Sequence, residues 1–245
     1  MNPARAVLDR LGVRVSRRSR INRFQAMEQS LRLLSSNGFS PKTIIDAGAN
    51  VGDWTMLARE IFPAAEIHMI EPQSGCAPAL QSIASASPQI RFHQVAVTRP
   101  GVPQVSMSGG GPLHRGTGAW VLEYAEPSAG EQVCEATTLD DLIPTDAAMP
   151  LLLKLDLEGH EMAALEGAET LLNKVEVVVT EVSLFDINDS HRPLLADILG
   201  MLKARGFDLY DFASLSARIR DGRLRQADVV FVRHESQLAR DHAWE

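Results

Sequence analysis

The stretch DAGANVGDWT, residues 46–55, places an acid and two glycines directly after the apolar run at 43–45. Glycine lets the backbone adopt positive φ and come close to a ligand. In open α/β sheets, ligands bind beyond the carboxyl ends of the strands, where the strand order reverses. A strand ending at Ala47, this turn and a helix beginning near Asp53 therefore predict a site for a nucleotide-like ligand.

The spacing within the turn separates the kinds of nucleotide. Gly48, Asn50 and Gly52 do not follow the G-x-G-x-x-G pattern of dinucleotide sites, and the G-K-[ST] of a phosphate-binding loop is absent. Asp46, in front of the turn, would repel phosphates and suits a cationic ligand such as a sulfonium or an amino group.

Glu71 ends the next predicted strand, 25 residues after Asp46. At this spacing an acid accepts hydrogen bonds from ribose hydroxyls. An adenosine ribose joined to a cationic amino-acid tail describes S-adenosylmethionine (SAM). The alternative interpretation is a purely structural turn, with Glu71 as a helix cap.

A second group of ionisable residues, KLDLEGHE at 154–161, ends the fourth predicted strand. Strand alternation puts Lys154, Asp156 and Glu158 on one face. Unpaired acids at a buried strand end are costly, so they should serve a ligand, a metal or each other. The alternative is that Glu158 and Glu161 cap the next helix and complement its dipole.

Glu181 ends the fifth predicted strand and should lie at the same sheet edge as Asp156. Two carboxylates there could bind a divalent ion such as magnesium, or they could orient a substrate. His160 lies beside them in the sequence and is the candidate base. Asp156, His160 and Glu181 are therefore the candidate catalytic residues, and the metal is left unassigned.

The elements that must position these groups alternate between apolar runs and amphipathic segments. Strands are predicted at 43–47, 66–72, 90–97, 151–159, 175–183, 207–212 and 227–234, with a further strand and turn in 131–143. Helices are predicted at 20–37, 54–62, 76–86, 160–174 and 193–206. This alternation predicts an α/β fold with a mostly parallel sheet and helices on both faces.

The charge of the chain is unevenly distributed. The 245 residues carry a net charge of −7, whereas residues 1–23 hold seven arginines and one acid. We predict an arginine-rich leader and helix at 1–40 and one domain at 41–245, with a loop-rich insertion at 99–130 and a hairpin near 119–124. The leader could be a solvated or amphipathic segment. It could also contact an anionic partner, a membrane surface or a second subunit, which leaves a homo-oligomer open.

Other features bear on the compartment. No apolar stretch approaches the roughly 20 residues of a membrane span, and the N-terminus lacks the apolar core of a signal peptide. Cys76 and Cys134 are far apart and form no metal-binding spacing. We therefore expect a cytoplasmic protein.

Four segments together resemble the FkbM-type family of SAM-dependent methyltransferases. They are DAGANVGDWT, the pair Glu71-Pro72, TTLDDL at 137–142 and KLDLEGHEMAALEGAETLL at 154–172. The similarity covers about residues 43–183. It implies a class I methyltransferase (Rossmann-like) fold, whose seven-stranded sheet has its last strand antiparallel to the rest. It also implies O-methylation of a hydroxyl on a sugar, a glycan or a natural product.

The resemblance also implies a cofactor site. Asp46, Gly48, Asn50 and Gly52 would line the methionine end of SAM, and Glu71 would hold the ribose. Ala96, at the end of the third predicted strand, would approach the adenine, and Asp156 is included among the cofactor-binding candidates.

The reaction expected from this site is an in-line displacement, in which a hydroxyl of a small acceptor attacks the SAM methyl. The glycine spacing argues against an NAD-dependent oxidoreductase. The second acidic cluster argues against a non-catalytic SAM-binding or scaffold protein. A nucleic-acid methyltransferase is opposed by the acidic net charge and by the aromatic content of 5%. We therefore expect no nucleic-acid partner.

Overall fold

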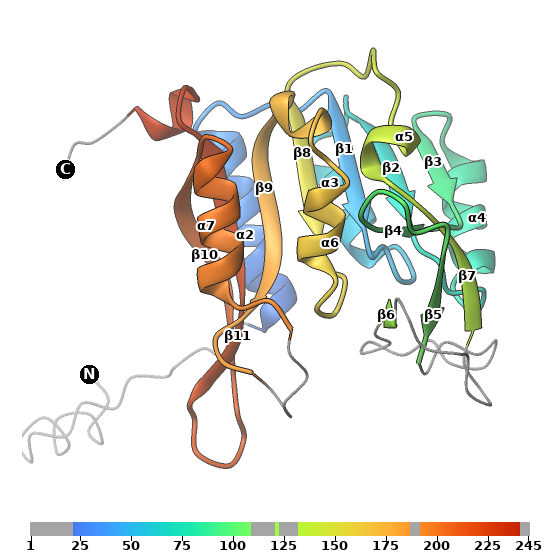
Figure 1. Cartoon of the computed structure of the whole chain (residues 1–245). Helices are drawn as coiled ribbons and strands as arrows, with labels where there is room; N and C mark the ends of the chain where they lie inside the picture. Colours follow the sequence, from blue (N-terminus) through green and yellow to red (C-terminus); the bar gives the residue numbers. More distant parts are fainter. Residues whose placement is uncertain (1–21, 109–120, 123–131, 187–191, 241–245) are drawn as a thin grey trace, which may run out of the picture.

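Seven strands pair into one sheet in the order β10-β11-β9-β8-β1-β2-β3 (Figure 1). The structure is a computed structural model that describes residues 22–108, 121–122, 132–186 and 192–240. The strands are β1 Thr43–Ala47, β2 Glu66–Ile70, β3 Ile90–His93, β8 Leu151–Leu155, β9 Val175–Ser183, β10 Phe207–Ala217 and β11 Leu224–Arg233. Only β11 runs antiparallel to its neighbours, β9 and β10. The predicted class I methyltransferase topology, mostly parallel with an antiparallel last strand, is confirmed.

The central strands are buried on both faces, which explains their almost continuous apolar sequences. Every residue of β1 and β8 is buried, with no more than 5% of its surface exposed. The register pairs Asp46 with Lys154 and Ala47 with Leu155 on these adjacent parallel strands. The segments that follow β1 and β8 therefore leave the sheet at the same edge and the same level.

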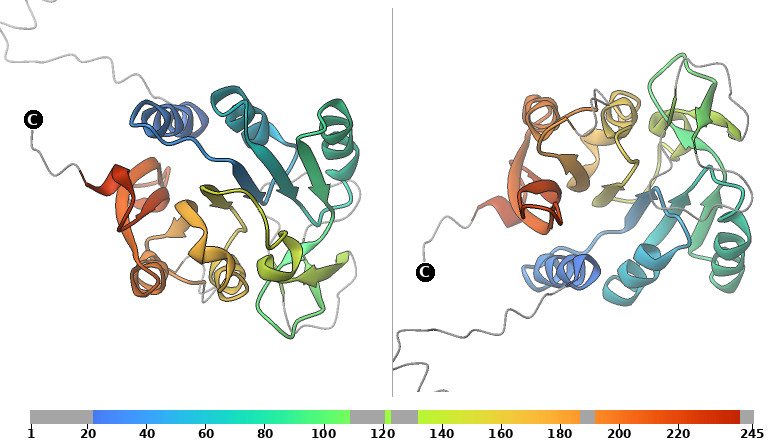
Figure 2. Two further views of the ribbon diagram at one scale, coloured as in Figure 1. Left: turned by 90° about the horizontal axis from the view of Figure 1, so that it is seen from above. Right: turned by 90° about the horizontal axis from the view of Figure 1, so that it is seen from below.

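Helices cover the sheet in two layers (Figure 2). One face carries α2 Arg23–Ser36, α3 Asp53–Ile61 and α4 Ala77–Ala86, and the other carries α5 Leu139–Leu142, α6 Glu161–Glu166 and α7 Leu195–Ala204. Met27, Leu31 and Leu34 of α2 belong to the same buried cluster as α3 and β2. Helix α2 therefore packs on the core of the sheet. Residues 1–21 of the predicted leader lie outside the described residues.

The predicted strand 90–97 is wrong in its extent. The chain leaves the large sheet after His93, and Ala96–Val97 forms β4 in a smaller sheet of order β4-β7-β5-β6. Its other strands are β5 Gln104–Met107, β6 Val121–Leu122 and β7 Gln132–Thr137. The apolar run continues past His93 because Ala96 and Val97 bury their side chains in two different cores. Most of the predicted hairpin near 119–124 lies outside the described residues.

Two further elements differ from the predictions. The helix predicted at 160–174 ends at Glu166, and a short 3-10 turn, Leu171–Asn173, follows. At Gly167 a Cβ atom would lie 2.1 Å from the carbonyl oxygen of Thr98, so the chain there passes too close for any other residue. The last two strands are longer than predicted and form a hairpin that projects beyond the sheet (Figure 1).

None of the helices in the described part of the chain is long and apolar enough to cross a membrane.

Candidate active site

The glycine turn after β1 is held tightly against the segment after β8. Gly48 has φ +81°, and a Cβ atom built on it would lie 2.0 Å from the carbonyl oxygen of Asp156. Gly52, with φ +93°, precedes the first residue of α3. Asn50 also has positive φ, +50°. The turn predicted from the sequence thus brings bare backbone to the edge of the sheet.

A buried ion pair lies beneath this turn. Asp46 is fully buried, and its Oδ1 lies 2.9 Å from Nζ of Lys154. The hydroxyl of Thr55 donates to Oδ2 at 2.6 Å, and Nζ of Lys154 also donates to the carbonyl oxygen of Gly48 at 2.8 Å. Burial alone would lower the pKa of Lys154, but the charges of Asp46, Asp156 and Glu71, together with the hydrogen bond to Asp46, shift the pKa upward. The cation next to Asp46 in this structure is therefore Lys154, which connects the acid to the turn.

Glu71 follows β2 and is 3% exposed. Its Oε2 accepts the backbone N–H of Asn50 at 2.9 Å, and its Oε1 accepts that of Gln73 at 3.0 Å. Burial raises the pKa of this carboxyl group, while the two N–H donors act in the opposite direction. The carboxylate is thus fixed in place, and each oxygen keeps a lone pair for a further donor such as a ribose hydroxyl.

A cleft opens beside Glu71. Five of the predicted cofactor residues line it: Gly48, Asn50, Glu71, Ala96 and Asp156. Asp46 and Gly52 are not among its lining residues. Gln73 also lines the cleft, and its buried Oε1 has no hydrogen-bond partner in the described part of the chain.

The chemistry of this cleft fits an adenosine group. A fixed carboxylate suits the ribose hydroxyls, and the free Oε1 of Gln73 can accept from an exocyclic amino group. Ile70, Val95 and Val97 supply apolar walls for a ring. The cofactor suggested by the sequence therefore has suitable partners here.

A second hollow lies between α2 and the sheet edge. Its walls include Phe24, Met27 and Trp54, together with the carboxylates of Glu181 and Asp228. Gly48, Asn50, Asp156 and Arg23 line both hollows. The two spaces therefore meet at Asp156 and Arg23.

Arg23, the first residue of α2, ties together carboxylates from three parts of the sheet. Its Nε and Nη2 donate to Asp228 at 2.7 and 2.6 Å. Nη2 also lies 2.8 Å from Oε1 of Glu181 and 3.5 Å from Oδ2 of Asp156. This guanidinium offsets part of the negative charge at the meeting point of the two hollows.

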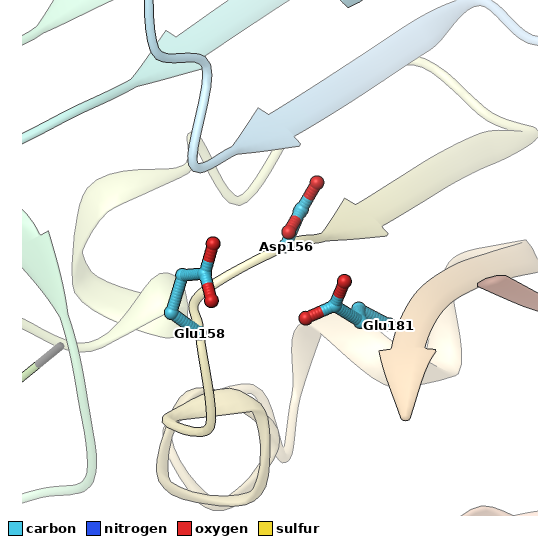
Figure 3. A group of neighbouring side chains, drawn as sticks. All are labelled: Asp156, Glu158 and Glu181. Atoms are coloured by element: carbon cyan, nitrogen blue, oxygen red, sulfur yellow. The ribbon is translucent and has the colours of Figure 1, made fainter. Parts of the chain in front are cut away.

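Asp156, Glu158 and Glu181 form a possible cation site. Each offers a carboxylate oxygen, and these oxygens lie within 4.8 Å of one another (Figure 3). Carboxylate oxygens are ligands that Mg²⁺ accepts. The guanidinium of Arg23 already contacts two of these groups, so a metal ion would compete with it.

The sequence of the domain decides its family. Residues 46–209, more than half of the chain, match the family described as Methyltransferase FkbM domain. The chain belongs to the FkbM methyltransferase family. It is accordingly a SAM-dependent methyltransferase, and the turn, Glu71 and the cluster at Asp156 and Glu181 all lie inside the matched region.

Solved structures and curated proteins were also compared with this FkbM-family chain. It is similar to a methyltransferase FkbM from Methylobacillus flagellatus KT, with a TM-score of 0.48 and 17% identity over 79% of this chain and 44% of that one. It is also similar to a 1,6-didemethyltoxoflavin-N1-methyltransferase from Burkholderia thailandensis (TM-score 0.48, 14% identity, 85% and 78% covered). A third is a magnesium protoporphyrin IX methyltransferase from Synechocystis PCC 6803 (TM-score 0.44, 12% identity, 95% and 92% covered). The chain thus spans less than half the length of the first of these structures, and no curated protein matches it.

Within this FkbM-family site, the structure separates the three catalytic candidates. Asp156 and Glu181 meet at Arg23, as their positions at the ends of β8 and β9 predict. His160 is buried on the wall of the cleft beside Glu71, where its Nε2 lies 3.0 Å from the hydroxyl of Thr98. Asp156 is the candidate that borders both hollows.

The sequence reasoning missed two residues that organise this site. It counted Arg23 only as part of a basic leader, and it treated Asp228 as an ordinary residue of the last strand. Asp228 is 3% exposed. One signal was available: a single acid inside the β-branched run ADVVFV needs a buried polar partner.

The buried carboxyl of Glu181 should make the stability of this methyltransferase depend on pH. Burial and the charge of Asp156 raise its pKa from 4.5 to about 8, against the opposing effect of Arg23. Between these two values the folded chain keeps a proton that the unfolded chain has lost. The contribution of Glu181 to the free energy of unfolding therefore falls as pH rises from about 4.5 to about 8.

We expect Glu181→Gln to remove this part of the pH dependence. Urea unfolding across the same pH range should show the free energy of unfolding of the variant rising relative to that of the wild type as pH rises. The expected difference is a few kcal/mol, at about 1.4 kcal/mol per pKa unit. Glu166→Gln, at an exposed position, is the control. Parallel curves for wild type and Glu181→Gln would contradict the assignment.

Proposed function

We propose that this methyltransferase transfers the methyl group of SAM to a hydroxyl oxygen of a small molecule, of the class of sugars, glycans and natural products. The observation that carries the proposal is the meeting of two hollows at Asp156. One hollow holds the carboxylate of Glu71, which suits a ribose. The other offers carboxylates and apolar walls, which suit a hydroxylated acceptor.

On the cofactor side, the residues of the cleft would divide the binding of SAM. The carboxylate of Glu71 would accept hydrogen bonds from the ribose hydroxyls, and Ala96 would lie against the adenine. Gly48 and Asn50 would let their backbone approach the amino-acid end, with Asp156 beside it. Asp46 would act through Lys154, which holds the carbonyl of Gly48. When bound, SAM supplies an electrophilic methyl group.

On the acceptor side, a neutral hydroxyl is a poor nucleophile and needs help to lose its proton. We propose His160 as the base, with Asp156 and Glu181 orienting the hydroxyl. Alignment of donor and acceptor by these side chains could contribute up to roughly 7–11 kcal/mol. His160 lines the cofactor cleft and not the second hollow, so the acceptor hydroxyl would have to reach it beside Asp156, which borders both.

A magnesium ion is the second way to activate the hydroxyl. Asp156, Glu158 and Glu181 have suitable oxygens. For an ion to bind there, the guanidinium of Arg23 would have to withdraw from Glu181, so magnesium dependence would report a movement of the Arg23 side chain. Activity assays with and without magnesium test this.

Calorimetric titration with SAM and with S-adenosylhomocysteine is the first experiment. We expect saturable binding of both, and no binding of NADH. Purified protein would then be screened for methyl transfer from labelled SAM to pooled sugars, phenols and polyketides. Binding of neither adenosine compound would overturn the proposal. Binding of both without transfer to any acceptor would favour the non-catalytic alternative. The oxidoreductase alternative is replaced by the family assignment.

The cellular setting remains part of the proposal. Cys76 and Cys134 are both buried, and neither forms a disulfide, which favours a reducing compartment such as the cytoplasm. We also propose that the chain is divided into a leader and helix at 1–40 and a domain at 41–245, which contains the insertion at 99–130. Limited proteolysis, with mass spectrometry of the fragments, would locate the true boundary.

A further inference from the structure

The hairpin that joins β10 to β11 has a charge opposite to that of the chain. Its distal segment, ARIRDGRLR at 217–225, contains four arginines and one aspartate. This is a net charge of +3 in nine residues of a chain whose total is −7. The hairpin lies beyond residue 209, where the family match ends.

The hairpin lies at the same edge of the sheet as the candidate active site. Gln226 pairs with Ser183 at the carboxyl end of β9, and its side-chain amide donates to Oε2 of Glu181 at 2.9 Å. Figure 1 shows the tip projecting past the carboxyl ends of the parallel strands. The tip is therefore anchored next to the site and extends away from it.

Contacts at the base of the tip fix its shape. The guanidinium groups of Arg218 and Arg223 lie over the ring of Phe185, with 5.1 and 4.2 Å from each guanidinium carbon to the ring centroid. Arg218 also pairs with Asp221. Cation–π contacts of this kind are attractive, so they help to hold the turn in this conformation. The turn is thus a formed structure that presents the residues between Arg218 and Gln226.

The presented residues combine cations with exposed aliphatic side chains. Residues 219–225 are all exposed. Ile219, at the apex, is fully exposed, and Leu215 and Leu224 are 56% and 40% exposed. The side chain of Arg220 is 77% exposed. Single exposed aliphatic residues are ordinary, but here three of them share one projecting hairpin with arginines.

We propose that this tip docks on the surface of an anionic lipid bilayer. Its arginines would lie at the level of the head groups, and Ile219 would enter the boundary of the acyl chains. Each arginine near an anionic surface strengthens binding, and an apolar residue adds burial in the interface. Charge complementarity also orients the domain, because residues 24–245 outside the tip carry more acids than bases and are repelled by the same surface.

A nucleic acid is the less suitable polyanion. Binding of single strands uses aromatic side chains on which bases stack. The segment 213–226 contains no aromatic residue, and Phe185 is already covered by two arginines. Aliphatic residues at the apex suit lipid better. If the proposed methyl transfer is correct, docking would hold the acceptor side of the site against a membrane-bound acceptor.

Sedimentation of the full chain with vesicles tests the docking without requiring activity. We expect binding to vesicles of phosphatidylglycerol and phosphatidylcholine, none to phosphatidylcholine alone, and weakening by salt. Arg220→Glu should weaken binding roughly thirtyfold, because it removes one attraction and adds one repulsion of about fivefold each. Ile219→Ser should weaken it by roughly tenfold or less.

Matched controls carry the same changes at other places. Arg240→Glu alters an exposed arginine near the opposite edge of the sheet, and Leu33→Ser alters an aliphatic residue of α2 that is 45% exposed. Both should bind vesicles like the wild type, and melting curves would confirm that all variants fold. Equal binding by Arg220→Glu and Arg240→Glu would overturn the proposal, as would no binding to anionic vesicles. Arg220-dependent binding to a single-stranded oligonucleotide but not to vesicles would also overturn it.

Discussion

Asp46→Ala is expected to abolish measurable SAM binding and to destabilise the fold by about 3–5 kcal/mol. The substitution removes the carboxylate that pairs with the ammonium of Lys154. Because Lys154 is only 5% exposed, water cannot replace this partner. It also removes the acceptor of the Thr55 hydroxyl at the start of α3. Both losses loosen the turn whose backbone must face the cofactor. Urea unfolding and titration with S-adenosylhomocysteine measure the two effects separately.

A second substitution separates lost stability from lost binding. Replacing a buried ion pair by apolar residues is often neutral for stability, whereas removing one partner is not. We therefore expect Asp46→Ala/Lys154→Met to recover most of the stability. Binding should stay weak, because the bond from Lys154 to the carbonyl of Gly48 is also gone. Glu60→Ala, which breaks only an exposed ion pair with Arg32, is the control and should change stability by about 1 kcal/mol or less.

If Asp46→Ala binds SAM with unchanged affinity, the acid is not what holds the turn. If the double variant recovers binding together with stability, then the turn depends on the packing beneath it and not on the bond to Gly48. Either result would leave Glu71 as the main anchor predicted for the cofactor.

The sequence predicted the parts of the site that depend on local geometry. The positive φ of Gly48 and Gly52 follows from the glycine turn. Asp156 and Glu181 meet because the carboxyl ends of neighbouring parallel strands share one edge. Glu71 could be found from its spacing alone. In each case a short segment and the direction of a strand were enough.

The remaining parts depend on contacts between distant segments. Arg23 and Asp228 are 205 residues apart, and no periodicity connects a helix start with the middle of the last strand. The sequence alone suggested a cationic ligand as the partner of Asp46. The pairing of Asp46 with Lys154 depends on the register between two strands, which is a property of the folded sheet. The run 90–97 was one strand by pattern and two by structure, since its residues divide between two cores.

Two of the residues in these long-range contacts lie outside the part of the chain that matches the family. Arg23 and Asp228 both lie outside residues 46–209, yet they enclose the hollow proposed for the acceptor. The hairpin at the same edge is also outside the matched region. Segments outside the matched region thus contribute part of the wall of the proposed acceptor hollow, and substitutions there should alter acceptor selectivity.

His160→Ala is expected to leave SAM affinity nearly unchanged and to lower kcat by about 10²- to 10⁴-fold, the usual contribution of a general base. The partners proposed for the adenosine are Glu71 and Gln73, and the imidazole is not among them. Its loss should therefore appear in the chemical step. Single-turnover assays with saturating SAM, on the acceptor found by screening, measure this.

Two further variants distinguish a base from a structural residue. Thr98→Val removes the hydroxyl beside Nε2 of His160, so a base oriented by Thr98 should show a smaller fall in kcat with little change in KM. Glu181→Gln keeps a side chain that can bond Gln226 and should raise the KM for the acceptor more than it lowers kcat. Turnover unaffected by His160→Ala would remove His160 from the mechanism. The carboxylates that meet at Arg23 would then be the remaining candidates for taking the proton, with Asp156 first because it borders both hollows.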